Sequence, residues 1–310
     1  MEIFKKETHI DFLAPRKIAA GISILVILFS LGSLMTRGLN FGIEFKGGVV
    51  LEAAFPDPVD LPPIRQGLEA AGFDRPVVQH FGSSREVTVQ LLPQEGADPG
   101  GLRDGIMAVL QDIEAGAELR RVEFVGPQVG KELREQGALA TIFALVMILA
   151  YVSFRFQWKF SLGAVAALVH DVIITLGFFS VTYLDFDLSV LAAVLAVVGY
   201  SLNDTIVIFD RIRENMLRLR KKSVTDIMNI SLNQTLSRTI MTGLTTLVVL
   251  IALFVLGGEA VSGFAVALIV GIVVGTYSSV YVASAFALQL KVTTLDIAPP
   301  TKEEAPDALP

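Results

Sequence analysis

Long blocks of apolar residues constrain this chain of 310 residues more than any other feature. Hydrophobic residues make up 53% of the chain, and most of them are gathered in blocks, which is typical of membrane proteins. A helix that crosses a bilayer needs about 20 mostly apolar residues. Six segments meet this requirement: Ile18–Thr36, Gly137–Phe154, Phe160–Leu184, Leu188–Phe209, Thr239–Gly258 and Ala260–Leu290. The sequence therefore predicts an α-helical integral membrane protein with six transmembrane helices.

The first apolar segment, residues 18–36, differs from a cleaved signal peptide. Its uncharged stretch is longer than the roughly 7 to 15 residues of a signal core, and no Ala-x-Ala site follows it. We interpret it as a retained anchor, preceded by a cytoplasmic segment, residues 1–17.

The distribution of basic residues predicts the orientation. Lysine and arginine are frequent before the first span, between the second and third spans and after the fourth, whereas the short loops 185–187 and 257–259 have none. Basic loops stay in the cytoplasm, so both termini are expected there. The net charge of -6 sums over two compartments and identifies no partner. Because the chain has no cysteine, any domain outside the membrane folds without disulfides.

One soluble insert, residues 37–136, separates the first two spans. Strand patterns occur at 49–55, 77–82, 86–92 and 118–126, and helix patterns at 61–72 and 100–113. A Ser-Ser turn is expected between the second and third strands. The order βαββαβ predicts a small α+β, ferredoxin-like extracytoplasmic domain, a fold that by itself identifies no function.

The remaining spans, within residues 137–290, are expected to form one bundle with a cytoplasmic loop at 211–238. Residues 223–238 within this loop have the character of an interfacial helix. The tail, residues 291–310, is polar and contains proline, so we expect it to be disordered.

Small residues recur at every fourth position of the sixth span. They begin with Gly263, Ala267, Gly271 and Gly275 and continue to Ala287. A continuous face of small side chains lets another helix approach closely in lipid. Either another helix of this bundle or a partner protein could occupy that face.

Two acidic residues lie inside the apolar segments, and an ionisable group in the bilayer indicates function. From the helical rise, Asp171 lies roughly 16 Å into its span and Asp204 roughly 10 Å from the cytoplasmic surface. At 100° per residue, Ser201 shares a stripe with Asp204, and Asn203 lies on a second polar stripe. This side of the helix must face protein or water.

Arg238 and Thr242, one turn apart at the start of the fifth span, are candidates to line the same cavity as Asp204. A carboxylate beside an arginine in such a cavity can bind and release protons. Structural alternatives stay open: Arg238 could be a snorkelling boundary residue, and His170 with Asp171 could be a hydrogen-bonded pair that ties two helices.

Five motifs together are specific. They are IDFLAPRK before the first span, GLNFGIEFKGG after it, VGPQVGKEL before the second, HD in the third and VGYSLNDTIVIFDRIREN in the fourth. With these motifs the chain resembles the SecF family, membrane subunits that pair with SecD as accessories to the bacterial Sec protein-export channel. The signature loop after the first span comprises Gly42, Glu44, Phe45, Gly47 and Gly48. The family typically has Asp where this chain has Glu44.

The resemblance implies that the chain is half of a twelve-helix bundle of the resistance-nodulation-division (RND) type, with SecD as the other half. It implies a proton relay at Asp204, with Asn203 beside it, Arg238 as its electrostatic partner and Thr242 nearby; Asp171 and Ser201 are secondary candidates. It also implies use of the proton motive force to promote late preprotein translocation. The expected partners are SecD, the Sec translocon, unfolded preprotein, protons and membrane lipids, with no nucleic acid, cofactor, metal or enzymatic activity.

Two other function classes were weighed. An RND-type exporter of lipid or small molecules would keep the architecture, but the external domain of about 100 residues is smaller than such pumps usually carry. An intramembrane aspartyl protease could use Asp171 and Asp204, but these enzymes pair a Y-D with a G-x-G-D motif, and the acids here follow His170 and Asn203.

Overall fold

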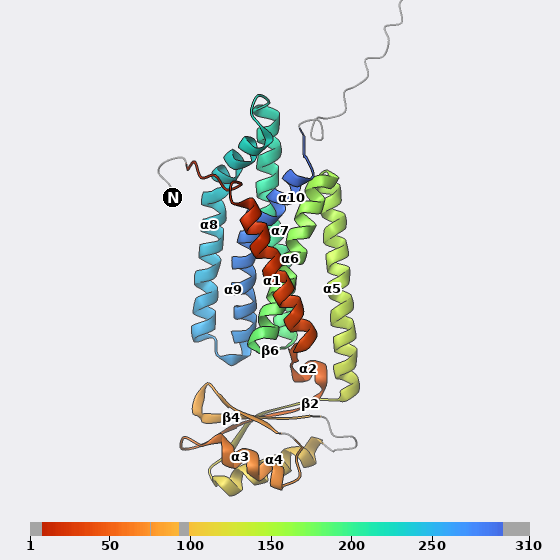
Figure 1. The fold of residues 1–310 in the computed structure, drawn as a ribbon. Coiled ribbons are helices and arrows are strands. Elements are labelled where there is room, and N and C mark those ends of the chain that lie inside the picture. Colours follow the sequence, from red (N-terminus) through yellow and green to blue (C-terminus); the bar gives the residue numbers. More distant parts are fainter. Residues whose placement is uncertain (1–7, 75, 93–98, 294–310) are drawn as a thin grey trace, which may run out of the picture.

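The computed structural model describes residues 8–74, 76–92 and 99–293, which form a long helical bundle with a small sheet domain at one end (Figure 1). The described residues contain six helices that are long and apolar enough to cross a membrane. The predicted fold class, six transmembrane helices with one small α+β domain, is confirmed. Helix α1 begins, and α10 ends, at the end of the bundle away from the sheet domain (Figure 1).

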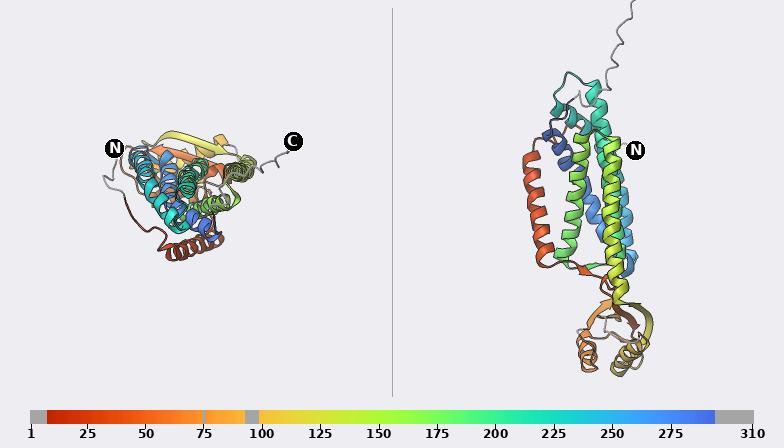
Figure 2. Two further views of the ribbon diagram at one scale, coloured as in Figure 1. Left: turned by 90° about the horizontal axis from the view of Figure 1, so that it is seen from above. Right: turned by 90° about the vertical axis from the view of Figure 1, so that its right-hand side faces the viewer.

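Five membrane helices are continuous, and the sixth contains a π-helical turn. The helices are α1 (Arg16–Thr36), α5 (Pro127–Arg155), α6 (Trp158–Thr182), α7 (Leu188–Arg218), α8 (Val224–Leu256) and α9 (Glu259–Ser278), which continues through η1 (Ser279–Ala283) into α10 (Ser284–Gln289). Helix α9 packs against α6, α7 and α8, and α1 lies against α6 at the edge of the bundle (Figure 2).

Several helices extend beyond the apolar segments. Helix α5 begins at Pro127, a residue that suits the first turn of a helix, ten residues before the predicted span. The predicted loop at 211–238 is largely helical: α7 continues to Arg218, and α8 begins at Val224 with the Ser223 side chain as its N-cap. Charged residues end an apolar block without ending a helix, because outside the bilayer the helix needs no apolar surface.

The sheet domain follows the predicted order of elements. It contains β2 (Gly48–Ala54), α3 (Leu61–Ala70), β3 (Val77–Phe81), β4 (Ser83–Leu91), α4 (Pro99–Ile113) and β5 (Glu118–Val125). The strand order is β3-β4-β2-β5 and all pairs are antiparallel, which is the ferredoxin-like arrangement. Both helices cover the face of the sheet that points away from the bundle (Figure 1).

The core of this domain lies between the sheet and its two helices. Leu51 and Val89 from the sheet and Ile64 and Leu110 from the helices are inaccessible to solvent. The predicted Ser-Ser turn is wrong: both serines belong to β4, and Gly82, with φ 71°, makes the turn before them. Glycine adopts this left-handed conformation without strain.

A second, two-stranded sheet connects the two parts of the chain. Strand β1 (Asn40–Phe41), which follows α1, pairs in parallel with β6 (Asp185–Phe186), which lies between α6 and α7. The short helix α2 (Ile43–Lys46) then leads into β2. The sheet domain is thereby attached to the hairpin of α6 and α7 as well as to α1 and α5.

Candidate functional site

Asp171 on α6 lies at the crossing of three helices and is inaccessible to solvent. Ser201 of α7 and Ser278 of α9 both donate hydrogen bonds to its Oδ2, at 2.5 and 2.7 Å. Nδ1 of the neighbouring His170 lies 2.8 Å from its Oδ1. Because buried carboxylates are costly unless their oxygens are hydrogen-bonded, this site holds α6, α7 and α9 together.

His170 and Asp171 do pair, but both lie on α6, so this pair does not itself tie two helices. The interhelical contacts come from Ser201 and Ser278. Ser278 was absent from the candidates read from the sequence. It lies three residues after Gly275 rather than four, so the repeat of small residues does not include it.

The face of small residues on α9 packs on α7. A Cβ added to Gly263 would lie 2.9 Å from Val190 Cγ2, one on Gly271 2.0 Å from Val197 Cγ2, and one on Gly275 3.0 Å from Ser201 Cβ. Ala267 on the same face is inaccessible to solvent. The close approach of the two helices brings Ser201 and Ser278 to the Asp171 carboxylate.

Asp204 lies one turn after Ser201 on α7, and its side chain is 4% exposed. Its Oδ2 is buried and has no hydrogen-bond partner among the described residues. Arg238 of α8 acts on the carboxylate electrostatically, without a direct ion pair. Asp204 therefore has the open acceptor position that Asp171 lacks.

Three of the other predicted relay residues lie on the two helices that form the seam beside Asp204: Asn203 on α7, and Arg238 and Thr242 on α8. Asn203 and Arg238 are exposed, whereas Thr242 is half-buried. The Thr242 hydroxyl donates to the carbonyl oxygens of Arg238 and Thr239 within its own helix, so it is not free to serve the carboxylate in this arrangement. The six residues thus divide between the closed Asp171 site with Ser201 and the open Asp204 site.

Charged side chains form a collar at the end of the bundle away from the sheet domain. Asp210 pairs with Arg155 of α5 at 2.6 Å, and Arg211 pairs with Glu214 at 2.6 Å. All four side chains are partly exposed. These contacts fit surface ion pairs at the boundary of the membrane, which contribute little stability individually.

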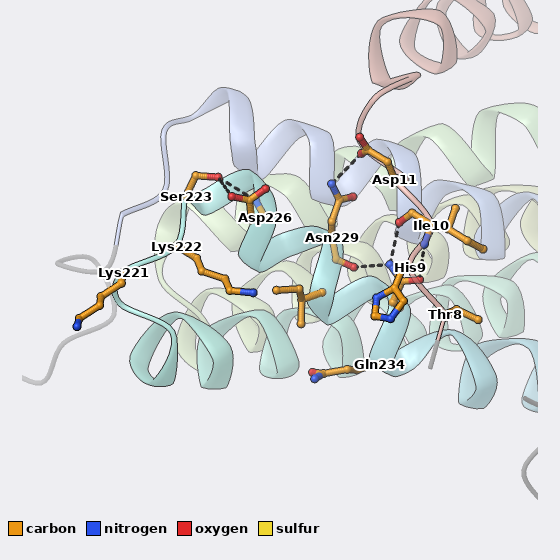
Figure 3. Close-up of a pocket in the computed structure, with 12 residues that line it drawn as sticks. Thr8, His9, Ile10, Asp11, Lys221, Lys222, Ser223, Asp226, Asn229 and Gln234 are labelled. Carbon is orange, nitrogen blue, oxygen red and sulfur yellow. Dashed lines mark hydrogen bonds between the residues drawn. The ribbon is translucent and has the colours of Figure 1, made fainter. Parts of the chain in front are cut away.

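The segment before α1 lies along α8 beside a pocket of about 750 Å³ (Figure 3). The Asn233 side chain accepts a hydrogen bond from the Ile10 N–H and donates one to the Ile10 carbonyl. Asn229 accepts a hydrogen bond from the Leu13 N–H and donates one to the Asp11 carboxylate. Leu13 is inaccessible to solvent. The motif IDFLAPRK therefore fixes the start of α1 to α8.

Two glycines of the signature loop make the transition from α2 to the sheet domain. Gly47 and Gly48 have φ values of 76° and 135°. A Cβ on Gly48 would lie 2.3 Å from the Leu91 carbonyl oxygen, and one on Gly47 would lie 3.0 Å from the Pro127 Cα. Both the conformation and the space require glycine at these positions.

The other signature residues contact the hairpin of α6 and α7. Phe45 is 3% exposed and packs with Phe41 and Phe186, and a Cβ on Gly42 would meet Glu44 and Asp187. Burial raises the pKa of the Glu44 carboxyl above its ordinary value, against the effect of a backbone hydrogen bond. Nearby negative charges, led by that of Asp187, raise this pKa further.

Comparison with known proteins identifies the family. Residues 106–293 match the family described as "Protein export membrane protein SecD/SecF, C-terminal", and residues 32–56 match the "SecD/SecF GG Motif". Protein translocase subunit SecF of Vibrio alginolyticus is 50% identical over 304 residues, which are 98% of this chain and 96% of that protein. The chain belongs to the SecF family. The SecF subunit of Pseudomonas aeruginosa is 48% identical and covers 97% of this chain and 98% of its own.

Solved SecDF structures share the fold of this SecF-family chain. The crystal structure of SecDF from Thermus, titled a translocon-associated membrane protein, superposes with a TM-score of 0.84 at 38% identity. A second, titled a super-membrane-facing form, has a TM-score of 0.71 at the same identity. Each match covers 93% of this chain and 40% of the SecDF chain, so the present chain spans less than half of those proteins.

In this SecF-family chain the two acids do not form a protease dyad. Such a dyad needs two carboxyl groups that share one proton. The Asp171 oxygens are instead bound by His170, Ser201 and Ser278, and no hydrogen bond joins Asp171 to Asp204. Within residues 8–74, 76–92 and 99–293, no three His, Cys, Asp or Glu side chains are grouped to hold a metal ion.

Proposed function

We propose that this chain is an accessory subunit of the Sec protein-export machinery and uses the proton motive force, together with a SecD partner, to promote late preprotein translocation. The observation that carries the proposal is the Asp204 carboxyl group, buried in a membrane helix with an oxygen that no described residue binds. An ionisable group in this setting is costly, so its presence indicates a role in transport.

The polar surface beside Asp204 supports a partner bundle. Asn203 and Arg238 are exposed on helices that otherwise present apolar side chains such as Val249 and Leu244. Polar side chains rarely face lipid at this depth. The chain corresponds to 40% of the matched SecDF chain, and a SecD subunit as the other half of an RND-type bundle would cover this surface.

The attachment of the sheet domain offers a route from proton binding to work. Protonation of Asp204 removes its attraction to Arg238, which changes the packing of α7 against α8. Helix α7 begins just after β6, which pairs with β1 and so connects to α2 and the sheet domain. One charge moved through 100 mV releases about 2.3 kcal/mol, so one or two protons can bias a rearrangement of a few kcal/mol.

The basic residues Arg155 and Lys159 at the adjoining ends of α5 and α6, and those after α7, support an orientation with both termini in the cytoplasm of a bacterium. The sheet domain then lies outside the cytoplasmic membrane, where it would hold emerging preprotein near the translocon. Export of a lipid or small molecule by the same architecture is the alternative. The part of the external domain that the structure describes has no feature that favours this alternative.

The experiment replaces Asp204 with Asn in the full chain. The variant is co-purified with its SecD partner to verify assembly, and completion of preprotein translocation is measured in inverted membrane vesicles with and without a proton gradient. We expect the gradient-dependent part to disappear. The matched control is Asp210→Asn, which removes an acid from the same helix where it pairs at the surface. Gradient-dependent export that persists in Asp204→Asn would refute the relay.

A further inference from the structure

Helices α7 and α8 run antiparallel along the seam between them. Toward the end with the charged collar, Arg211 bonds Gln234 at 2.7 Å, and Asn215 bonds Ser231 at 2.9 Å. Toward the other end, Tyr200 Oη lies 3.9 Å from the position of a Cβ on Gly243.

The contact of Tyr200 with Gly243 places Asp204 near the level of Thr239. Asp204 follows Tyr200 by four residues on α7, and Thr239 precedes Gly243 by four residues on the antiparallel α8. Four residues are about one helical turn on each helix. Both side chains therefore lie one turn from the contact of Tyr200 with Gly243, toward the charged collar.

Three polar atoms of this part of the seam lack hydrogen bonds. Asp204 Oδ2, Thr239 Oγ1 and Tyr200 Oη are all buried and have no partner among the described residues. Threonines elsewhere on α8, such as Thr235 and Thr245, donate to carbonyl oxygens of their own helix. Buried polar groups in proteins are nearly always paired, so three unpaired groups within about one turn indicate a site at which hydrogen bonds form during function.

We propose that Thr239 and Tyr200 position the Asp204 carboxyl group for proton exchange, directly or through one bridging water molecule. A hydroxyl both donates and accepts, so it can bond to an ionised carboxylate and to a protonated carboxyl group. On uptake, an O–H bond of a hydronium ion breaks as one forms at Asp204 Oδ2; on release, that bond breaks as the proton passes to a water molecule. This inference rests on the proposed function and extends it to two residues outside the predicted relay.

Tyr200 also gives the site a direction. It lies one turn from Asp204 toward the sheet domain. The Thr276 hydroxyl of α9 lies 3.7 Å from the position that a Cβ on Gly243 would occupy, the same position that lies near the Tyr200 hydroxyl. The hydroxyls of Tyr200 and Thr276 thus mark a polar route to Asp204 from the external side. Arg238 lies on the opposite, cytoplasmic side of Thr239 in the α8 sequence.

Few charged or titratable groups surround Asp204. Arg238 faces it from α8. From α6 come His170 and Asp171, which bond to each other, and α9 contributes Tyr277, whose hydroxyl is bonded to α1. On α5, Arg155 pairs with Asp210, further toward the charged collar. A shift of the infrared carboxyl band that Asp204→Asn abolishes therefore reports on Asp204.

The test uses the full chain assembled with its SecD partner in proteoliposomes. Thr239→Val and Tyr200→Phe remove the two hydroxyls at nearly constant shape. Two controls are used: Thr239→Ser keeps the hydroxyl at position 239, and Thr245→Val removes a hydroxyl that is already bonded within α8. Gradient-driven proton uptake is measured across pH. The infrared carboxyl band of Asp204, assigned by its loss in Asp204→Asn, is recorded in each variant.

We expect Thr239→Val and Tyr200→Phe to lower uptake by about tenfold or more, from the usual strength of a hydrogen bond to a charged group. Both should move the pH at half-maximal uptake by about one unit and shift the Asp204 band. Thr239→Ser and Thr245→Val should behave as the wild type. A wild-type rate, pH profile and band in both Thr239→Val and Tyr200→Phe would overturn the inference.

Failure of the inference can be told from failure of the proposed function. If Asp204→Asn loses uptake while the hydroxyl variants retain it with an unmoved band, only the roles of Thr239 and Tyr200 are refuted. If Asp204→Asn retains uptake, the relay itself is refuted. If Thr239→Val does not assemble, Tyr200→Phe still decides.

Discussion

Ser278 of α9 donates a 2.7 Å hydrogen bond to Asp171 of α6, and both residues are inaccessible to solvent. The same carboxylate oxygen accepts a bond from Ser201 of α7. Asp171 thus connects three membrane helices, whereas Asp204, one turn beyond Ser201, keeps an unbound oxygen. The two intramembrane acids have different surroundings, which fits a structural role for the first and the proposed proton exchange for the second.

Replacing Ser278 with Ala should destabilise the bundle. The change removes one of two donors to a buried carboxylate oxygen, which costs about 1–3 kcal/mol. The measurement is thermal unfolding of the purified full chain in detergent. Thr182→Ala, which removes an exposed hydroxyl from the same helix as Asp171, is the control. Equal melting temperatures for Ser278→Ala and the control would contradict the structural role of Asp171.

Replacing Gly271 with Ala should separate α9 from α7. Its Cβ would lie 2.0 Å from Val197 Cγ2, and overpacking of this kind costs about 1–3 kcal/mol, more than the gain of about 1 kcal/mol from the higher helix propensity of alanine. Gly21→Ala on α1, where nothing lies within 4 Å, isolates that gain. We expect the melting temperature to fall for Gly271→Ala and to stay level or rise for Gly21→Ala. A rise in both would place the small face against something other than α7.

Glu44→Gln should change how stability depends on pH. The pKa of Glu44 is raised by burial and by nearby acids, so folding favours the protonated carboxyl. Its contribution to stability is complete below the ordinary pKa of the unfolded chain and is lost as pH rises through the raised pKa. Glutamine mimics the protonated form at every pH. The melting temperature of Glu44→Gln should therefore rise relative to that of the wild type as the pH is raised from acidic to neutral. A difference in melting temperature that does not depend on pH would argue against the raised pKa.

The orientation can be tested cleanly, because the chain has no cysteine. Single variants Lys221→Cys, between α7 and α8, and Asp57→Cys, in the sheet domain, are exposed to a maleimide that cannot cross the membrane. In intact spheroplasts we expect Asp57→Cys to react and Lys221→Cys to react only after permeabilisation. The reverse pattern would place the sheet domain in the cytoplasm.

The architecture could be predicted because transmembrane helices appear as long apolar blocks and strands as short alternating segments. The order βαββαβ followed from these patterns, and periodicity placed Asp204 on a side of α7 that must face protein or water. The helix ends were harder to predict from the sequence. In α5, charged residues lie between Pro127 and the apolar block, and the backbone is helical through both. Strands β1 and β6 could not be foreseen, because two residues are too short to show a period.

Only part of the candidate site could be predicted from the sequence. Periodicity on one helix placed Ser201 and Asp204 on the same side of α7, but it contains no information on the register between helices. Two features depend on how far one helix is shifted along another. They are the hydrogen bond from Ser278 to Asp171 and the position of Thr239 across the seam from Asp204. That shift is set by side-chain packing, such as Val197 against Gly271, and was found only in the structure.

Proton movement through the assembled complex tests the central claim most directly. The full chain with its SecD partner is reconstituted in liposomes, a proton gradient is imposed, and the internal pH is followed with a trapped indicator. Proton uptake in Asp204→Asn should fall to the rate of liposomes without protein, while Asp210→Asn should retain the wild-type rate. Uptake in Asp204→Asn at the wild-type rate would contradict the assignment of Asp204 as the proton-exchanging group.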